Sequence, residues 1–258
     1  MSTEEAIIRC PICSETSPQG YLLCPFCGAD LTVVYEQKIF APVTYKESFF
    51  RIKELVIKPR KISQIIADNP DSKAGFLFSI AIALGLATQL IAYVIHTRTL
   101  DWKFYPVVFL IGWIAIFLLP FLIWFLGSWT IRTMSRLLGG KSSRKQIRSA
   151  VGYGMLPVVF AEIFNGIFLL IALPYEEPGD YDISGIISSM SNLRNSFAGI
   201  TCIVIHFAGI IASSVYIIFI AKPAFDFSWV ETAIATGVPL LLFAILMISY
   251  YIGSTYAT

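Results

Sequence analysis

The sequence carries little charge. Asp, Glu, Lys and Arg make up 14% of its 258 residues, and hydrophobic residues make up 56%. A soluble domain usually has about 25% charged residues. So few charged side chains cannot cover a chain of this length with polar surface, which argues against an ordinary soluble protein and favours lipid as the solvent. The net charge of +2 says little by itself, and we expect no nucleic acid partner.

Catalytic signatures are also missing. The chain has two histidines and contains no H-E-x-x-H, G-x-S-x-G or P-loop motif. The glycines in "VGYGMLP" at 151–157 follow no strand, so they do not make a dinucleotide fingerprint. We therefore predict that the protein is not an enzyme and has no catalytic residues. An intramembrane enzyme ranks third among the functions considered, after a membrane scaffold and a transporter.

A secretory leader is not expected either, because the first nine residues are mostly polar and include Glu4 and Glu5. Charge instead nearly vanishes from five long apolar runs, and each run exceeds the roughly 20 residues that a helix needs to cross a bilayer. The predicted spans are about 74–96, 104–130, 150–173, 197–221 and 229–253. Since backbone in lipid must satisfy its own hydrogen bonds, they predict an all-α polytopic membrane protein with five transmembrane helices.

The loops between these runs predict the orientation, since cytoplasmic loops are rich in Lys and Arg. The stretch 131–149 is basic and has no acidic residue, whereas 174–196 has four acidic residues and Arg194 alone. We therefore expect 131–149 and the N-terminus in the cytoplasm, and 174–196 and the C-terminus outside. Aromatic residues near span ends are expected at the membrane interface: Trp102, Trp124, Trp129, Tyr175 and Trp229.

The segment before the first run is basic, with eight Lys or Arg residues in 32–73. Within 44–67, the apolar residues Phe49, Ile52 and Val56 share one helical face. This pattern predicts a helix lying on an anionic inner leaflet, or else a linker helix packed under the bundle. The residues expected to form a lipid-facing basic surface are Lys58, Arg60, Lys61, Arg144, Lys145 and Arg148.

Four of the five cysteines stand in two close pairs near the N-terminus. Two residues separate Cys10 from Cys13 and Cys24 from Cys27, so both sulfurs of a pair can reach one ion. Four thiolates suit a structural Zn(II) ion, whose binding would supply the folding energy of so short a segment. Two disulfides are the main alternative, but the expected cytoplasmic location disfavours them. We expect Cys202, in the fourth run, to be a core residue.

The predicted organisation follows from these patterns. Residues 1–31 form a zinc ribbon, residues 32–73 form a basic linker with an amphipathic interfacial helix, and residues 74–258 form the five-span membrane domain. The small pairs Ala81 and Gly85, and Gly209 and Ser213, indicate close contacts between helices.

A few polar residues interrupt the apolar runs. Gln89, Glu162, Asn165 and His206 all lie in the outer half of the predicted bundle and could form one polar cluster. Ionisable groups in lipid are expensive, so this cluster is a candidate proton or ion relay, or a ligand site. The competing interpretation, which we favour, is that a protonated Glu162 bonds to His206 or Asn165 and holds the helices together.

Two stretches resemble a known family. "KPRKISQIIADNP" before the first run, "GGKSSRKQIRSAVGYGMLP" entering the third, and the five runs together resemble the Yip (Ypt/Rab-interacting-protein) domain family over about 55–253. The resemblance implies five spans and a cytosolic N-terminus, with no catalytic residues to transfer. Eukaryotic members are linked to trafficking and Rab-type GTPases, but this chain lacks their acidic "DLYGP"-type motif. "CPIC" and "CPFCGADL" resemble zinc ribbons that bacteria and archaea attach to membrane proteins.

These observations favour a membrane scaffold or adaptor in the plasma membrane of a prokaryote. The bundle would anchor the protein in the bilayer, as a single chain or as a homo-oligomer. The ribbon would recruit a cytosolic protein. The alternative is a small transporter or channel that uses Glu162 and His206.

Overall fold

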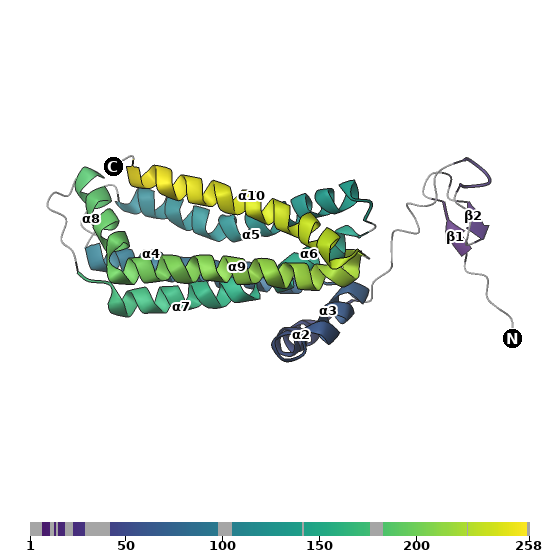
Figure 1. Cartoon of the computed structure of the whole chain (residues 1–258), viewed down its shortest axis with the longest axis horizontal. Coiled ribbons are helices and arrows are strands. Elements are labelled where there is room, and N and C mark those ends of the chain that lie inside the picture. The colour runs from purple at the N-terminus through teal and green to yellow at the C-terminus, as the bar shows by residue number, and fades with distance from the viewer. Residues whose placement is uncertain are drawn as a thin grey trace. The chain divides into compact units, whose positions relative to one another are not determined.

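The chain forms two compact units, Met1–Ala41 and Pro42–Thr258 (Figure 1). The computed structural model describes residues 7–10, 13, 15–18, 23–28, 42–97, 105–140, 142–175, 183–225 and 227–256. The predicted linker residues 32–41, the acidic loop residues 176–182 and Trp102 lie outside the described residues.

The N-terminal unit contains a small antiparallel hairpin. Strand β1 (Ile7–Arg9) pairs with strand β2 (Thr16–Pro18), with Ile7 opposite Pro18. The backbone N–H of Cys10 donates to the carbonyl of Glu15 at 2.9 Å, directly after β1. Such a short hairpin is marginal in water without further support. The cysteines described below are positioned to supply that support.

The second unit is a bundle of long helices. Four apolar stretches in it are long enough to cross a bilayer. They are helix α4 (Lys73–Thr97), most of helix α5 (Tyr105–Leu137), helices α6 (Arg144–Gly154) and α7 (Leu156–Ala172) taken together, and helix α9 (Phe197–Phe225). The prediction of an α-helical membrane protein is therefore confirmed for four of the five runs.

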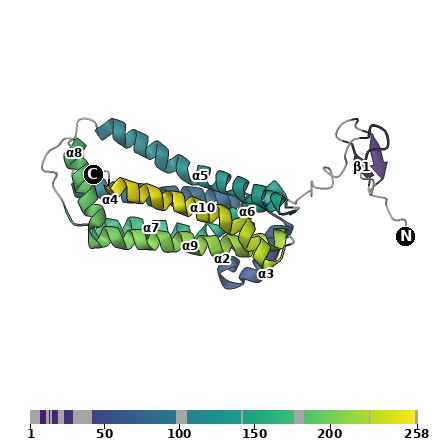
Figure 2. The same ribbon diagram turned by 45° about the horizontal axis from the view of Figure 1, so that its top comes forward.

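The fifth run forms helix α10 (Trp229–Tyr256), which packs against α5 and α9. In the turned view α10 lies between those two helices (Figure 2). Within the part of α10 whose side chains the structure describes, the continuous apolar stretch is Trp229–Leu242, which is shorter than the other four stretches. A fifth span at this place stays a prediction.

The basic segment 131–149 is largely helical, so its prediction as a loop is wrong. Helix α5 continues to Leu137 and α6 begins at Arg144. Gly139 ends the first helix with a φ of 87°, a conformation that glycine adopts without steric cost. Ser143 and Gln146 then form a capping box that starts α6. The described basic side chains of this segment therefore lie on helix ends, and the connection is short.

Two shorter stretches also depart from the expectation. The predicted outer loop 174–196 contains helix α8 (Ile183–Asn195), which packs on α9. The predicted amphipathic segment divides into α2 (Tyr45–Ile57) and α3 (Pro59–Asp68), because Pro59 cannot donate the hydrogen bond that would continue α2. Ile62 and Ile66 of α3 are buried in the main core.

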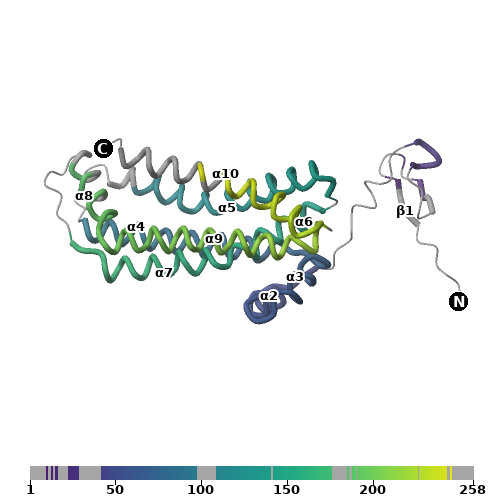
Figure 3. Tube along the Cα trace, viewed as in Figure 1, coloured from purple at the N-terminus to yellow at the C-terminus, as the bar shows by residue number. Residues whose placement is uncertain are grey.

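Helix α7 packs closely against both α4 and α9 in the bundle (Figure 3). A Cβ atom on Gly85 of α4 would lie 2.7 Å from the backbone carbon of Glu162 in α7. A Cβ on Gly209 of α9 would lie 2.7 Å from the Cβ of Ala161. The prediction that Gly85 and Gly209 mark close helix contacts is confirmed, and these contacts bring polar side chains of three helices within reach of one another.

Trp124 was expected at the membrane interface, and that prediction is wrong. Its side chain is 3% exposed, and its ring nitrogen donates to the carbonyl of Arg148 at 2.9 Å. A Cβ atom on Gly75 would collide with the Trp124 ring, and a Cβ atom on Gly152 would collide with the backbone of Gly75. Trp129 and Trp229 remain exposed, as interfacial residues would.

Candidate functional site

The four N-terminal cysteines meet at one point. Their sulfur atoms all lie within 4.8 Å of one another. The sulfurs of Cys10 and Cys27 are 3.6 Å apart, as are those of Cys13 and Cys24, so each close pair joins the two knuckles. Cys10 and Cys24 are 2% exposed, whereas Cys27 is exposed. The structure thus assembles a cluster that could hold a metal ion.

The spacing of the sulfurs fits metal binding better than disulfides. Ligands at about 2.3 Å from a tetrahedral zinc ion lie roughly 3.8 Å from one another. Disulfide sulfurs would lie about 2.05 Å apart, and all four cysteines are free thiols here. Gly28, with a φ of 70°, closes the second knuckle, and its N–H donates to the Cys24 carbonyl at 2.9 Å. All four ligand positions of the cluster are protein sulfurs.

The thiols of the cluster differ in acidity. Burial raises the pKa of Cys24, but backbone hydrogen bonds from Phe26 and Cys27 to its sulfur outweigh this and lower it to about 6. For Cys13, the backbone hydrogen bond at Glu15 lowers the pKa, while burial and its thiol neighbours raise it to about 12. A thiolate beside other thiols opposes their ionisation. A divalent cation removes that repulsion by binding all four as thiolates.

A second group of polar residues lies inside the bundle. Glu162 of α7 is 1% exposed. Its carboxylate accepts a hydrogen bond from the Gln89 amide of α4 at 2.6 Å, and its other oxygen contacts Nδ1 of His206 in α9. The structure therefore brings together three of the four polar residues singled out in the sequence, one from each helix.

Asn165 makes a different contact. Its amide nitrogen donates to the backbone carbonyl of Cys202 at 3.0 Å, which also links α7 to α9. Among the described residues, its buried side-chain oxygen has no hydrogen-bond partner. Cys202 is 6% exposed, which confirms it as a core residue. The contact of Asn165 and the contacts of Glu162 therefore join helices that already pack closely.

The predicted basic surface lies on helices α3 and α6 and on Lys58, which caps the end of α2. Its side chains are all exposed: Lys58, Arg60, Lys61, Arg144, Lys145 and Arg148. Lys58 lies 3.8 Å from Glu54, and the Arg148 guanidinium lies 4.9 Å from the ring centre of Phe125. Exposure is what contact with lipid headgroups would require.

The sequence did not single out a buried ionic network before α4. Asp71 is 4% exposed and accepts hydrogen bonds from Arg51 at 3.2 Å and from the Tyr153 hydroxyl at 2.8 Å. The hydroxyl of Ser48 donates to the same carboxylate at 3.2 Å. Arg51 also donates to the carbonyl of Asn69 at 2.7 Å. These contacts fix α2 against the start of α4 and against α6.

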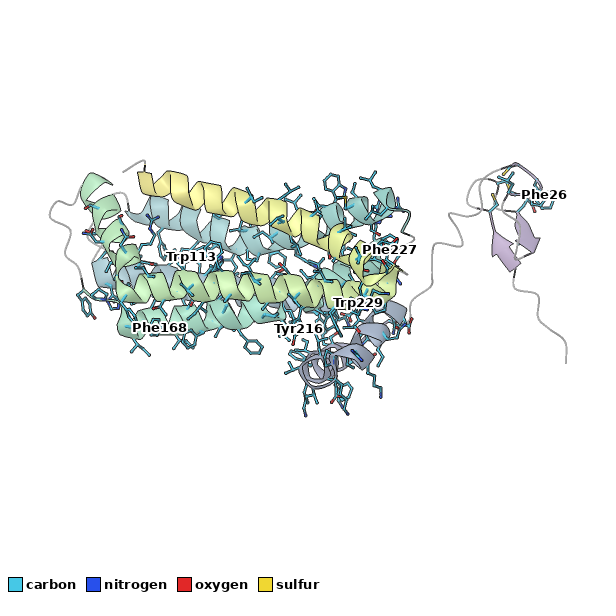
Figure 4. The ribbon with its side chains drawn as sticks, in the orientation of Figure 1. Phe26, Trp113, Phe168, Tyr216, Phe227 and Trp229 are labelled. Atoms are coloured by element: carbon cyan, nitrogen blue, oxygen red, sulfur yellow. The ribbon has the colours of Figure 1, made fainter. Side chains whose placement is uncertain are left out.

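Apolar side chains are exposed on both units. Leu23 and Phe26 of the cysteine knuckles are 59% and 65% exposed (Figure 4). On α2 a row of large apolar side chains is exposed as well: Tyr45, Phe49, Phe50, Val56 and Ile57.

Comparison with known proteins gives one match. The family model described as Yip1 domain matches residues 53–251. The match begins within α2 and extends into α10, so it covers the helical bundle and leaves out the cysteine cluster. No curated protein and no solved structure matches the chain.

Proposed function

This chain belongs to the Yip1 domain family, and from that membership we propose that it is a multi-pass membrane scaffold that recruits a cytosolic protein through its N-terminal cysteine cluster. The expected resemblance is thereby confirmed, and the family together with four apolar helices makes it a membrane protein. The Yip1 family is not an enzyme family. The proposal takes the cluster as a structural Zn(II) site on the cytoplasmic side of a prokaryotic plasma membrane.

The observation that carries the proposal is a complete set of four sulfur ligands in a unit separate from the bundle. A site with four protein ligands keeps no open position for water or substrate, so its role is structural rather than catalytic. Bound zinc would hold Cys10, Cys13, Cys24 and Cys27 in place and thereby fold the knuckles. The function of a unit with such a site must therefore lie in what its surface binds.

The surface of the knuckles offers a contact for a protein. Leu23 directly precedes Cys24, and Phe26 lies between Cys24 and Cys27; both side chains are more than half exposed. Exposed aromatic residues are frequent anchors in protein interfaces. The bundle would hold this contact at the membrane, with a fifth span in α10 and the C-terminus outside, alone or as a homo-oligomer. The basic side chains around α3 and α6 would face the inner leaflet.

A crosslinked pull-down from native membranes tests the proposal. We compare the wild type with a Cys10→Ser/Cys13→Ser variant, which removes two ligands, and with Leu23→Ser/Phe26→Ser, which keeps them. Cys202→Ser is the matched control, because it removes a buried thiol of the bundle. A partner captured by the wild type and the control, but lost from both N-terminal variants, supports the scaffold. Identical captures from all four membrane-inserted proteins contradict it.

A second candidate function rests on the carboxylate inside the bundle. Glu162 is buried among three helices and contacts an imidazole that is 33% exposed. A transporter or channel could use this pair to carry protons or ions. Gln89 and the close helix contacts at Gly85 favour a packing role instead, because both hold the carboxylate in one place.

Replacing Glu162 by Gln separates these two functions. The amide keeps hydrogen bonding but cannot ionise. In reconstituted vesicles, a scaffold predicts the same proton and cation leak for wild type and variant. A proton-coupled carrier predicts flux in the wild type that the variant loses, with unchanged insertion and thermal stability.

A further inference from the structure

Helix α2 has two faces of different character. One face packs on the bundle through three buried residues, Ser48, Arg51 and Leu55. The opposite face spans roughly 140° of the helix at 100° per residue and is exposed throughout. It consists of Tyr45, Lys46, Phe49, Phe50, Lys53, Val56 and Ile57. We call these seven residues the outer face of α2.

The outer face is held in a fixed position by the network around Asp71. Arg51 reaches Asp71 at 3.2 Å, and Asp71 lies two residues before α4 begins at Lys73. The Lys73 ammonium contacts the carbonyl of Val43 and lies 4.4 Å from the ring centre of Tyr45. Through these contacts, the start of α2 and its middle turn are both held at the start of the membrane-spanning helix α4. The outer face therefore lies at the depth where an apolar span meets the headgroups.

Other side chains at this end of the bundle fit the same depth. Trp229 is 54% exposed at the start of α10, and Lys222 of α9 lies 5.8 Å from the centre of its ring (Figure 4). Exposed tryptophans beside lysines are typical of the interface between hydrocarbon and headgroups. The aromatic residues of α2 extend this belt beyond the spanning helices.

We infer that the outer face of α2 binds the anionic surface of the bilayer. Its aromatic and aliphatic side chains enter the interface, and Lys46 and Lys53 contact phosphates of acidic lipids. This role differs from the proposed recruitment of a protein, because it involves α2 alone and none of the four clustered cysteines.

The charge of the face selects lipid over a second copy of the chain. Lys46 and Lys53 lie seven residues apart, so they occupy the same side of the helix, among the apolar residues. A second copy docked on this face would bring lysines against lysines, which is unfavourable. Acidic headgroups complement both charges, and long lysine side chains can reach them while their stems stay among apolar groups.

Photo-crosslinking in nanodiscs tests this inference on the full chain. A benzoylphenylalanine replaces Phe49, and the nanodiscs contain phosphatidylcholine with phosphatidylglycerol as a minor component. Mass spectrometry identifies the crosslinked product. With two lysines on the face, we expect phosphatidylglycerol adducts at about threefold or more over its share of the lipid.

Two charge variants and the identity of the product decide the outcome. Lys46→Gln/Lys53→Gln should remove the enrichment and keep lipid as the product. Arg144→Gln/Lys145→Gln loses the same charge from α6, and the enrichment at position 49 should persist. Products that join two protein chains, or lipid adducts without enrichment in the wild type, would overturn the inference.

Discussion

Individual residues carry most of what is specific to this bundle, and Asp71 is the clearest example. From the connection before α4 it binds Arg51 and Ser48 of α2 and Tyr153 of α6. A buried ion pair that is fully hydrogen-bonded adds little net stability, but removing one partner leaves a buried charge. Asp71 is therefore the residue whose loss should most disturb the placement of α2.

Replacing Asp71 by Ala should lower the free energy of unfolding by about 3 kcal/mol, near the low end for a broken buried pair. The loss stays near that end because Arg51 keeps its contact with Glu47 at 2.5 Å. Unfolding in mixed micelles with increasing sodium dodecyl sulfate measures the change. Asp68→Ala, at an exposed position nearby, should change it by less than about 0.5 kcal/mol. Equal losses for the two variants would show that the network does not stabilise the bundle.

Sequence reasoning reached some of these residues and missed others for a physical reason. The spacing of the cysteines is local, so their convergence could be predicted, and Gln89, Glu162 and His206 were found because polar residues are rare within apolar runs. Arg51 and Tyr153 lie 20 and 82 positions from Asp71. Arg51 is one of many charged residues in its segment, and a tyrosine such as Tyr153 is not unusual in an apolar run, so nothing local indicates that they meet. Asp71 itself, just before the first span, was the one signal available.

Helices show the same division between local and tertiary causes. Length and hydrophobicity predicted the four apolar stretches, and their bounds agree closely for α4 and α9. The charge of the stretch after Trp129 favours a loop in sequence reasoning, but Arg and Lys are good helix formers, and most of this stretch is helical. The pattern in 44–67 predicts that Phe49, Ile52 and Val56 share one face. Phe49 and Val56 are exposed together on α2, whereas Ile52 packs against the core. The buried face also includes Arg51, which the periodicity of apolar residues cannot reveal.

Close helix contacts make a prediction at the scale of elements. Gly85→Ala should destabilise the bundle by about 1–3 kcal/mol, because the added methyl group meets the backbone of Glu162 and must push α4 away from α7. Thermal unfolding in detergent measures the loss.

The matched control is Gly127→Ala in α5, where an added Cβ meets nothing within 4 Å. That change should be neutral or stabilise the helix by up to about 1 kcal/mol. A loss at Gly127 as large as at Gly85 would contradict the assignment of α4 and α7 as the closely packed pair.

For the whole molecule, the sequence predicted the membrane bundle, the family and the convergence of the cysteines. Composition is a property of the entire chain, so it indicates the solvent without any knowledge of packing. The role of the cluster and the side of the membrane that it occupies remain proposals, because they depend on a partner and a bilayer. The account therefore rests on the claim that a metal ion folds the N-terminal unit.

Native mass spectrometry of the purified intact protein tests that claim most directly. We predict one zinc ion on each wild-type chain and on Cys202→Ser, and none on Cys10→Ser/Cys13→Ser, with the same helix content by circular dichroism in all three. A chain without metal, or one whose mass corresponds to two disulfides, would contradict the account.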